Sequence, residues 1–180
     1  PAIAKRILEE NEEKIKEFAS GRAKEDLHSI VIAGSGFQYA NACEGALKAT
    51  EAALLYSNYW ELEEGLHGPW YNMQSNELLV VNVITGKTYE KSKLLVKGIQ
   101  EISSNTWAIT NTEDALEGAD FITRLPPGLP ESMYGLLTIL PVYMFIYFYA
   151  LEAGKNHPDH GPYDSQEFMD ARWILRDIEK

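Results

Sequence analysis

The sequence predicts an α/β fold: a doubly wound, mostly parallel sheet flanked by helices on both faces. Three observations lead to this prediction. Short apolar runs of strand length alternate with longer segments of helical periodicity. Two of these runs are apolar almost throughout, as parallel strands buried on both faces tend to be. The first run ends in a glycine turn, Gly34-Ser35-Gly36, and a helical pattern follows at once, which is typical of the ligand-binding edge of such sheets.

In the first third of the chain, apolar residues at helical spacing predict an amphipathic helix from Ile3 to Ser20. Gly21 is expected to end it as a C-terminal cap. The run from Ser29 to Ala33 is expected to form a buried strand, and the alanine-rich segment from Gln38 to Ser57 a helix. The aromatic and acidic segment 59–73 is expected to form a short helix followed by a loop.

The remaining elements repeat the alternation of strands and helices. Continuous apolar residues predict strands at 78–84, 106–109 and 121–125. Inward-facing Leu94, Leu95, Val96 and Ile99 indicate a helix over 89–102. After a proline-rich turn at 126–130, the apolar segment 134–150 is expected to be helical. The polar stretch from Asn156 is expected to form a tail, with a short final helix around 166–178.

The length fits one domain with a single core. A net charge of −11 argues against a nucleic-acid partner, which would require clustered Lys and Arg. It leaves a phosphorylated ligand open, because helix N-termini bind phosphate through backbone amides. Cys43 is the only cysteine, so it can neither form a disulfide within the chain nor join a cysteine cluster that holds zinc. We expect no metal, no cofactor, no signal peptide and a cytoplasmic location.

The segment Tyr134–Ala150 is almost free of charge, but we do not expect it to contact a membrane. It has the minimal length of about 17 residues for a span, contains Pro141 and lacks basic flanks. A helix that is apolar all round is more simply one that is buried. We interpret it as a core or interface helix.

Gly34-Ser35-Gly36 does not fit nicotinamide binding. The dinucleotide fingerprint requires a third small residue where this chain has Tyr39. It also requires an acidic residue at the end of the second strand, where the chain reads Ile84-Thr85-Gly86.

Within the helix that follows the glycine turn, Glu44, Lys48 and Glu51 are spaced i, i+4, i+7 and therefore share one face. In the simplest interpretation they form a solvated stripe, with a Glu44–Lys48 pair contributing roughly 0.3 kcal/mol. Their position after a glycine turn favours a stripe that faces a cleft. His67 follows soon after three carboxylates, Glu61, Glu63 and Glu64.

Together these residues carry a resemblance to a known family. The pattern consists of a glycine turn, an aromatic residue, Glu44-Gly45-Ala46-Leu47-Lys48 with Glu51 soon after, and His67-Gly68-Pro69. It resembles the second sugar-isomerase (SIS) domain of the glucosamine-6-phosphate synthase group, which includes SIS-type fructosamine-6-phosphate deglycases. The parts occur in the family's order and at similar spacing, and the resemblance extends weakly along nearly the whole chain.

The resemblance implies a phosphosugar-processing enzyme of deglycase or aldose–ketose isomerase type. Glu51 matches the proton-transferring glutamate and His67 the ring-opening histidine, which is often supplied to a neighbouring subunit's site. Lys48 matches a lysine near the substrate hydroxyls and Glu44 a positioning residue, while Gly34, Ser35 and Gly36 are expected to contact substrate. Glutamate and histidine also suit this chemistry independently, because it moves protons between carbons and opens a ring.

Two departures from the family pattern refine the expectation. The chain has no lysine between Lys155 and Lys180, where the synthase has one in its tail; this favours a deglycase acting on an amino or glycated hexose 6-phosphate. It also has no Ser/Thr-rich phosphate loop after the strand at 78–84. We therefore expect residues 1–24 to be a connector helix and 25–180 to be the second of two SIS domains. The expected partner is a second SIS domain or a second copy, as in a homodimer.

Two alternatives stay open at this point. The chain could be a non-catalytic SIS module that binds a sugar phosphate and regulates another process. It could also be a generic flavodoxin-like domain in which the motif match is a coincidence. A sensor has no need of a base together with an imidazole, which favours the enzyme.

Overall fold

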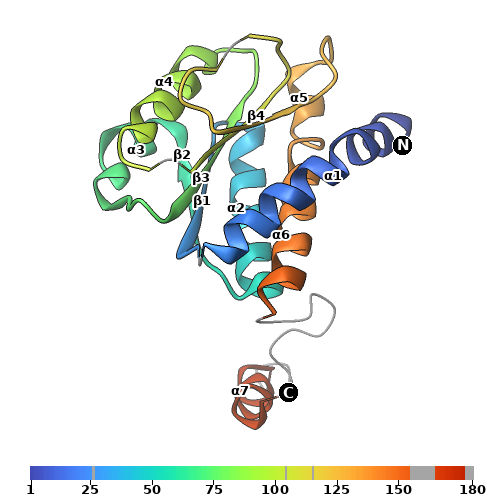
Figure 1. The fold of residues 1–180 in the computed structure, drawn as a ribbon, viewed down its shortest axis with the longest axis vertical. Helices are drawn as coiled ribbons and strands as arrows, with labels where there is room; N and C mark the ends of the chain where they lie inside the picture. Colours follow the sequence, from blue (N-terminus) through green and yellow to red (C-terminus); the bar gives the residue numbers. More distant parts are fainter. Residues whose placement is uncertain (26, 104, 115, 155–164, 177–180) are drawn as a thin grey trace.

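A computed structural model describes residues 1–25, 27–103, 105–114, 116–154 and 165–176. The predicted α/β class is confirmed: a five-stranded parallel sheet lies between two layers of helices (Figure 1). The strands are β1 (Ser29–Gly34), β2 (Tyr56–Glu61), β3 (Glu77–Val83), β4 (Thr106–Thr110) and β5 (Phe121–Arg124). The helices are α1 (Ala2–Lys24), α2 (Phe37–Ala53), α3 (Leu62–His67), α4 (Tyr89–Gln100), α5 (Glu131–Tyr134), α6 (Ile139–Ala153) and α7 (Gln166–Arg176), with a 3₁₀ turn η1 (Pro69–Asn72).

The strand order is β2-β1-β3-β4-β5, and all neighbouring strands are parallel. β1 is paired on both sides: Ile30 lies beside Ser57 of β2 and Leu78 of β3. From β1 the chain passes to β2 on one side and then to β3 on the other, so the order of the strands reverses between β1 and β3. In open α/β sheets the carboxyl ends of the strands at such a point flank the ligand crevice. The glycine turn lies at this point.

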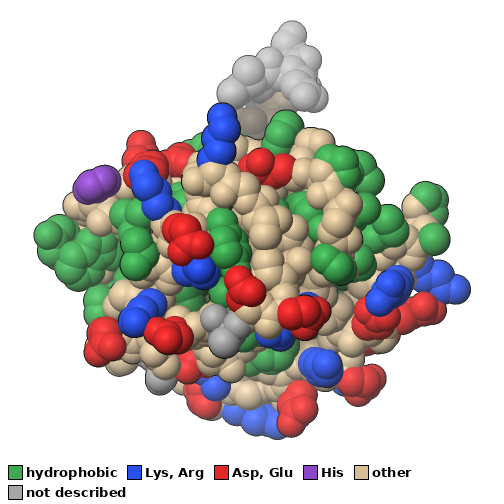
Figure 2. All heavy atoms as spheres, turned by 90° about the horizontal axis from the view of Figure 1, so that it is seen from above, with side chains coloured by type: hydrophobic (Ala, Val, Ile, Leu, Met, Phe, Trp, Pro, Cys, Tyr) green, Lys and Arg blue, Asp and Glu red, His purple; other side chains and the backbone are tan. Residues whose placement is uncertain are grey.

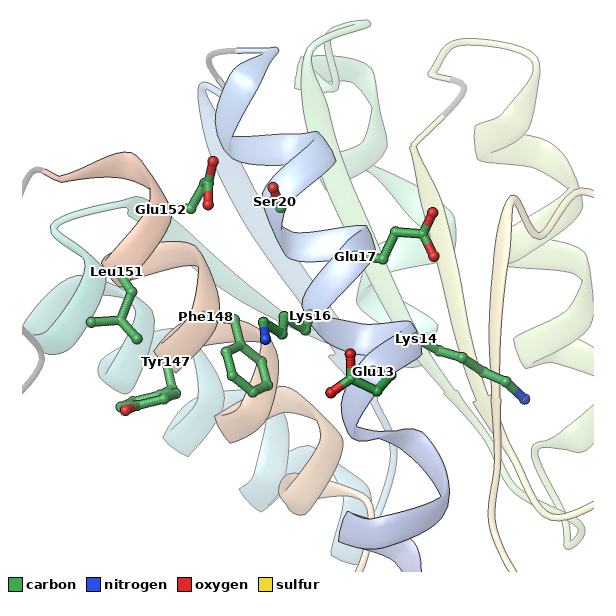
Figure 3. Close-up of a pocket in the computed structure, with 9 residues that line it drawn as sticks. All are labelled: Glu13, Lys14, Lys16, Glu17, Ser20, Tyr147, Phe148, Leu151 and Glu152. Atoms are coloured by element: carbon green, nitrogen blue, oxygen red, sulfur yellow. The ribbon is translucent and has the colours of Figure 1, made fainter.

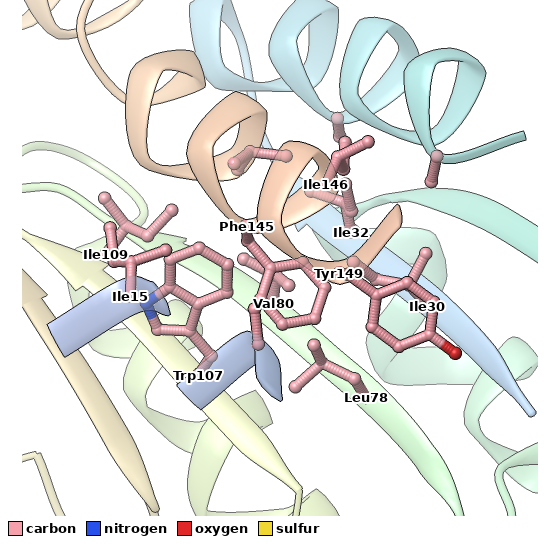
Figure 4. Close-up of a cluster of buried hydrophobic side chains, with 14 of the residues drawn as sticks. Ile15, Ile30, Ile32, Leu78, Val80, Trp107, Ile109, Phe145, Ile146 and Tyr149 are labelled. Carbon is pink, nitrogen blue, oxygen red and sulfur yellow. The ribbon is translucent and has the colours of Figure 1, made fainter. Parts of the chain in front are cut away.

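Each face of the sheet has its own hydrophobic core. On one face, α1, α2 and α6 cover alternate residues of β1, β3 and β4, and Figure 4 shows Trp107, Phe145 and Tyr149 packed there. On the other face, α3 and α4 cover the intervening residues, among them Leu79 and Val81. Because side chains alternate along a strand, apolar strands require helices on both faces.

The first helix is longer than predicted. It continues through Gly21 to Lys24, so the expectation that Gly21 caps it is wrong. Its buried residues Ile7, Ile15 and Ala19 belong to the core beside α6, and this packing outweighs the cost of about 1 kcal/mol for a helical glycine. The division into a connector up to residue 24 and a domain from residue 25 stays a prediction, but α1 contributes to the same core.

Strand β2 was not predicted. The helix before it ends at Ala53 rather than Ser57, where Leu54 adopts a left-handed conformation with φ 50°. Residues 56–61 then pair with β1 instead of forming helix or loop. β2 is an edge strand with Tyr56 exposed and Trp60 buried. Its mixed polar and aromatic composition therefore lacks the continuous apolar signal by which the central strands were identified.

The apolar segment divides into two helices. The short α5 precedes α6, which begins at Ile139 rather than Tyr134. The segment Glu131–Ala153 is long and apolar enough to cross a membrane, but half of its most apolar 18-residue stretch is buried inside the protein. A core helix passes the same test.

The final helix begins at Gln166 as predicted and is described to Arg176. Residues 177 and 178 of the predicted helix, and the tail from Asn156 to residue 164, lie outside the described residues.

The packing of α1 makes a first prediction. Replacing the fully buried Ile15 by Ala should lower the free energy of unfolding by about 2–5 kcal/mol, because a cavity opens in the core. Urea unfolding would measure it. The control is Leu8→Ala on the same helix, where the side chain is exposed and an effect within about 0.5 kcal/mol is expected. Equal, small effects of both changes would show that α1 is not part of the core.

Candidate functional site

Helix α2 brings the predicted charged residues together. Lys48 Nζ lies 2.6 Å from Glu51 Oε2 and 3.7 Å from Glu44 Oε1. The Tyr143 hydroxyl of α6 donates a hydrogen bond of 2.8 Å to Glu44 Oε1. We call these four residues the α2 cluster. Between a third and a half of each charged side chain is exposed, so the cluster is accessible from solvent.

The charges of the α2 cluster reinforce one another. The hydrogen bond to Glu51, followed by the charges of Glu51 and Glu44, raises the pKa of Lys48 above its ordinary value. Burial and then the hydrogen bond to Glu44 raise the pKa of Tyr143. At neutral pH the cluster therefore presents a lysine cation, a neutral phenol and two carboxyl groups on one surface.

Gly45, the glycine within the motif, explains how α2 lies so close to its neighbours. A Cβ there would lie 2.7 Å from Ile32 of β1 and 3.0 Å from Val142 of α6. The side chain of Asn41 also fixes the first half of α2, since its Nδ2 donates to the Gly135 oxygen at 2.7 Å. The helix that carries the cluster is thus held tightly against the sheet and α6.

The glycine turn lies at the opposite end of α2 from Glu51. A Cβ on Gly34 would lie 2.5 Å from the backbone oxygen of Gln38, and Gly36 has φ +57°, so both positions require glycine. Two buried side-chain atoms beside the turn have no hydrogen-bond partner among the described residues, Gln38 Nε2 and Asn82 Oδ1. Polar groups of this kind, next to a helix N-terminus, suit contact with a polar ligand.

The turn and the predicted base do not meet within one chain. Fourteen residues of helix separate Phe37 from Glu51, which corresponds to about 20 Å at 1.5 Å per residue. Glu44 lies about two turns below the start of the helix and Glu51 near its end. A single hexose phosphate cannot contact Gly36 and Glu51 of the same chain at once.

His67 lies on the other layer. It ends α3, whose Leu62 belongs to the core on the face of the sheet opposite α2. The His67 side chain is exposed. In the described part of the chain no hydrogen bond, ion pair or ring contact joins His67 to Glu51 or Lys48. The structure therefore brings Glu44, Lys48 and Glu51 together but leaves His67 apart from them.

Two of the three carboxylates before His67, Glu61 and Glu63, have structural roles. Glu61 caps α3, its Oε2 accepting from the Glu63 backbone N–H at 2.7 Å. Glu63 forms an ion pair with Lys91 of α4. Glu64 lies near Tyr39, whose pKa is raised mainly by burial and to a lesser extent by neighbouring groups that include Glu64. Within the described ranges, no group of three His, Cys, Asp or Glu residues could hold a metal ion.

A large cavity lies away from the α2 cluster. It measures about 690 Å³ between α1 and α6 and is lined by charged residues of α1 and by Tyr147, Phe148 and Leu151 (Figure 3). None of the predicted site residues lines it. Figure 2 views the molecule from above and shows acidic and basic side chains interspersed on the face that it draws, without a continuous basic patch.

Tyr143 is the cluster residue that the sequence did not identify. It lies within a run of apolar and aromatic residues. In such a run the sequence does not distinguish a tyrosine that contacts Glu44 from a tyrosine that packs in the core. A signal was available, since Tyr143 and Tyr147 are spaced i, i+4 and both are partly exposed.

Comparison with known proteins gives relatives in sequence. No protein-family model matches the chain. It is 32% identical over 161 residues to a glutamine–fructose-6-phosphate aminotransferase (isomerizing) of Corynebacterium efficiens, a match that covers 86% of this chain and 25% of the relative. The chain spans about a quarter of the length of the curated relatives that it matches.

Solved structures give relatives in fold. The C-terminal domain of glucosamine–fructose-6-phosphate aminotransferase from Francisella tularensis superposes with a TM-score of 0.75 at 17% identity, over 85% of this chain and 43% of that one. The sugar isomerase domain of an RpiR transcription factor from Sphaerobacter thermophilus gives 0.66 at 14% identity, over 86% and 87%. The resemblance to the SIS domain is thus confirmed: this chain is similar in sequence to glutamine–fructose-6-phosphate aminotransferases and in fold to their C-terminal domain.

Proposed function

We propose that this chain is a catalytic SIS domain that processes an amino or glycated hexose 6-phosphate. The observation that carries the proposal is the α2 cluster, in which Lys48 and Glu51 lie 2.6 Å apart on an accessible surface. The similarity to aminotransferases that isomerize a sugar phosphate supports the substrate class. The absence of a lysine between 155 and 180 favours a deglycase. In that reaction proton transfer from C1 to C2 would form an imine at C1, and water would hydrolyse it to glucose 6-phosphate and the free amine.

In this proposal Glu51 moves a proton between adjacent carbons of the open-chain sugar. Its carboxylate is about half exposed and free to approach a substrate carbon once Lys48 turns toward the ligand. Lys48 has a raised pKa, so it stays cationic and can stabilise the negative oxygen that develops during proton transfer. Glu44, held by Tyr143, keeps Lys48 in place.

His67 is proposed to open the sugar ring in a site that it shares with the Glu51 of a second copy. The two residues lie on opposite layers of one chain, and the His67 side chain is exposed. An imidazole exchanges protons near neutral pH, as ring opening requires. The phosphate is proposed to be held mainly by a further SIS domain. Gly34, Ser35 and Gly36 are proposed to contact substrate at the end of β1 in a chain other than the one that supplies Glu51. We further propose a cytoplasmic homodimer in which residues 1–24 connect two SIS domains.

A second candidate function is a sugar-phosphate sensor without catalysis. It is favoured by the fold similarity to the sugar isomerase domain of a transcription factor. The pair of Lys48 and Glu51 argues for the enzyme, because a sensor gains nothing from a base at the reacting carbon. In a sensor, Glu51→Gln should leave ligand binding and its output unchanged.

The electrostatics of the cluster can be tested directly. Glu51→Gln should lower the pKa of Lys48 toward its usual value of about 10.4, because the main hydrogen bond that raises it is lost. The pKa of Lys48 is higher in the folded protein than in the unfolded chain. Its ion pair therefore contributes its full stabilisation at any pH below the unfolded pKa, and this contribution is lost as the pH rises through the folded pKa. The pair should therefore persist at neutral pH. NMR titration of the Lys48 side chain measures the shift.

The control for this titration is Glu44→Gln. Glu44 lies farther from Lys48 than Glu51 does, so its removal should change the Lys48 pKa less. Equal pKa values of Lys48 in the wild type and in Glu51→Gln would contradict the described geometry.

Turnover is tested by phosphorus NMR on this protein together with any segment that precedes it. Fructose 6-phosphate, glucosamine 6-phosphate and a fructosamine 6-phosphate are offered in turn. We expect glucose 6-phosphate from the glycated substrate alone, and a loss of about 10²–10⁴-fold in rate for Glu51→Gln. Glu9→Gln is the matched control, because Glu9 forms a similar exposed ion pair with Lys5 on α1.

Turnover of either other substrate would replace the deglycase by an isomerase or a deaminase. Line broadening by binding, with no product from any of the three sugars, would favour the sensor.

A further inference from the structure

A second cavity lies on the opposite layer of the sheet from the α2 cluster. It measures about 420 Å³ and lies between η1 and the strands β1 and β2. Its volume falls within the usual range for small-molecule sites. Among the residues that line it are His28, Tyr56, Asn58, Trp60, Asn72 and Glu77. None of them belongs to the α2 cluster or to the glycine turn.

The cavity contains a buried carboxylate without a cation. Glu77 is 8% exposed; the Ser29 hydroxyl donates to its Oε1 at 2.6 Å and the Gln74 backbone N–H to its Oε2 at 2.7 Å. No ion pair described for this chain includes Glu77, and no Lys or Arg lines the cavity. Each carboxylate oxygen can accept a second hydrogen bond. A buried carboxylate is stabilised most by a positively charged donor.

Aromatic side chains line the same cavity. Side chains alternate along β2. The Ser57 hydroxyl donates to the Ala46 oxygen of α2. Tyr56, Asn58 and Trp60 therefore share the opposite face, which lines the cavity. The Tyr56 ring is 76% exposed and lies 5.8 Å from the ring of His28. Tyrosine and tryptophan rings attract ammonium groups through their negative faces. Rings beside a carboxylate make a cavity that suits an organic cation and does not suit a phosphate.

The cavity also offers hydrogen-bond donors. Trp60 is 5% exposed, and its Nε1 has no partner among the described residues. A buried donor left unpaired destabilises the protein, and an oxygen atom of a ligand would remove that cost. Asn58 Oδ1 accepts from the Tyr59 backbone N–H at 2.8 Å, which leaves its amide N–H groups to donate.

We propose that this cavity binds a small molecule that carries an ammonium group together with a hydroxyl or carbonyl oxygen. The ammonium group would donate to Glu77 beside the ring of Tyr56, and the oxygen would accept from the donors of Trp60 and Asn58. The proposal is independent of the function proposed for the α2 cluster, since the two sites share no residue.

Titration calorimetry with matched probes tests it. D-glucosamine and ethanolamine each carry the ammonium group, and D-glucose and ethylene glycol are their neutral counterparts. We expect each amine to bind at least tenfold more tightly than its counterpart. Binding should weaken at least tenfold in Glu77→Gln and be unchanged in Glu9→Gln, the same chemical change in an exposed ion pair on α1. Tyr56→Leu, on the exposed rim, should also weaken binding and serves as the test if Glu77→Gln does not fold.

Three results would overturn the proposal. The first is that neither amine binds, and the second is that amines and neutral counterparts bind equally. The third is that Glu51→Gln abolishes binding while Glu77→Gln and Tyr56→Leu retain it, which would place the amine at the α2 cluster. Because glucosamine carries no phosphate, its binding is measured independently of phosphosugar turnover. A failure of the proposed catalytic function would therefore produce none of these three results.

Discussion

The structure depends on the pairing of β1 with parallel strands on both sides. All six residues of β1 are buried, and the same is true of the seven residues of β3. Strands that are apolar on both faces must be covered on both faces, so helices have to alternate between the layers. This constraint places α2 on one face and α3 on the other, independently of any functional residue.

The separation of the predicted catalytic residues follows from that constraint. Glu51 lies on α2 and His67 at the end of α3, although they are only sixteen positions apart in sequence. The chain between them forms the edge strand β2, which takes His67 around the edge of the sheet. A domain of this kind presents a base on one surface and an imidazole on another. Under the proposed mechanism, a complete site would require that two such surfaces face each other.

Much of the fold could be predicted, because its central strands are continuous apolar runs and its helices have clear periodicity. The grouping of Glu44, Lys48 and Glu51 followed from helical geometry alone. The prediction failed where tertiary packing outweighs local signals. α1 continues through Gly21 because Ile15 and Ala19 pack against α6, and β2 has an edge strand's mixed composition. The contact of Tyr143 with Glu44 joins residues 99 positions apart, and no local pattern encodes it.

The proposed mechanism requires that Glu51 of one copy and His67 of another act in one site, and mixing inactive variants tests this most directly. Glu51→Gln and His67→Asn proteins would each be inactive toward the phosphosugar substrate. Unfolding and refolding them together would form mixed assemblies in which one site has both native residues. The account predicts that the mixture regains turnover that neither variant shows alone. If the mixture stays inactive while refolded wild-type protein recovers fully, Glu51 and His67 do not act across two copies, and the account is wrong.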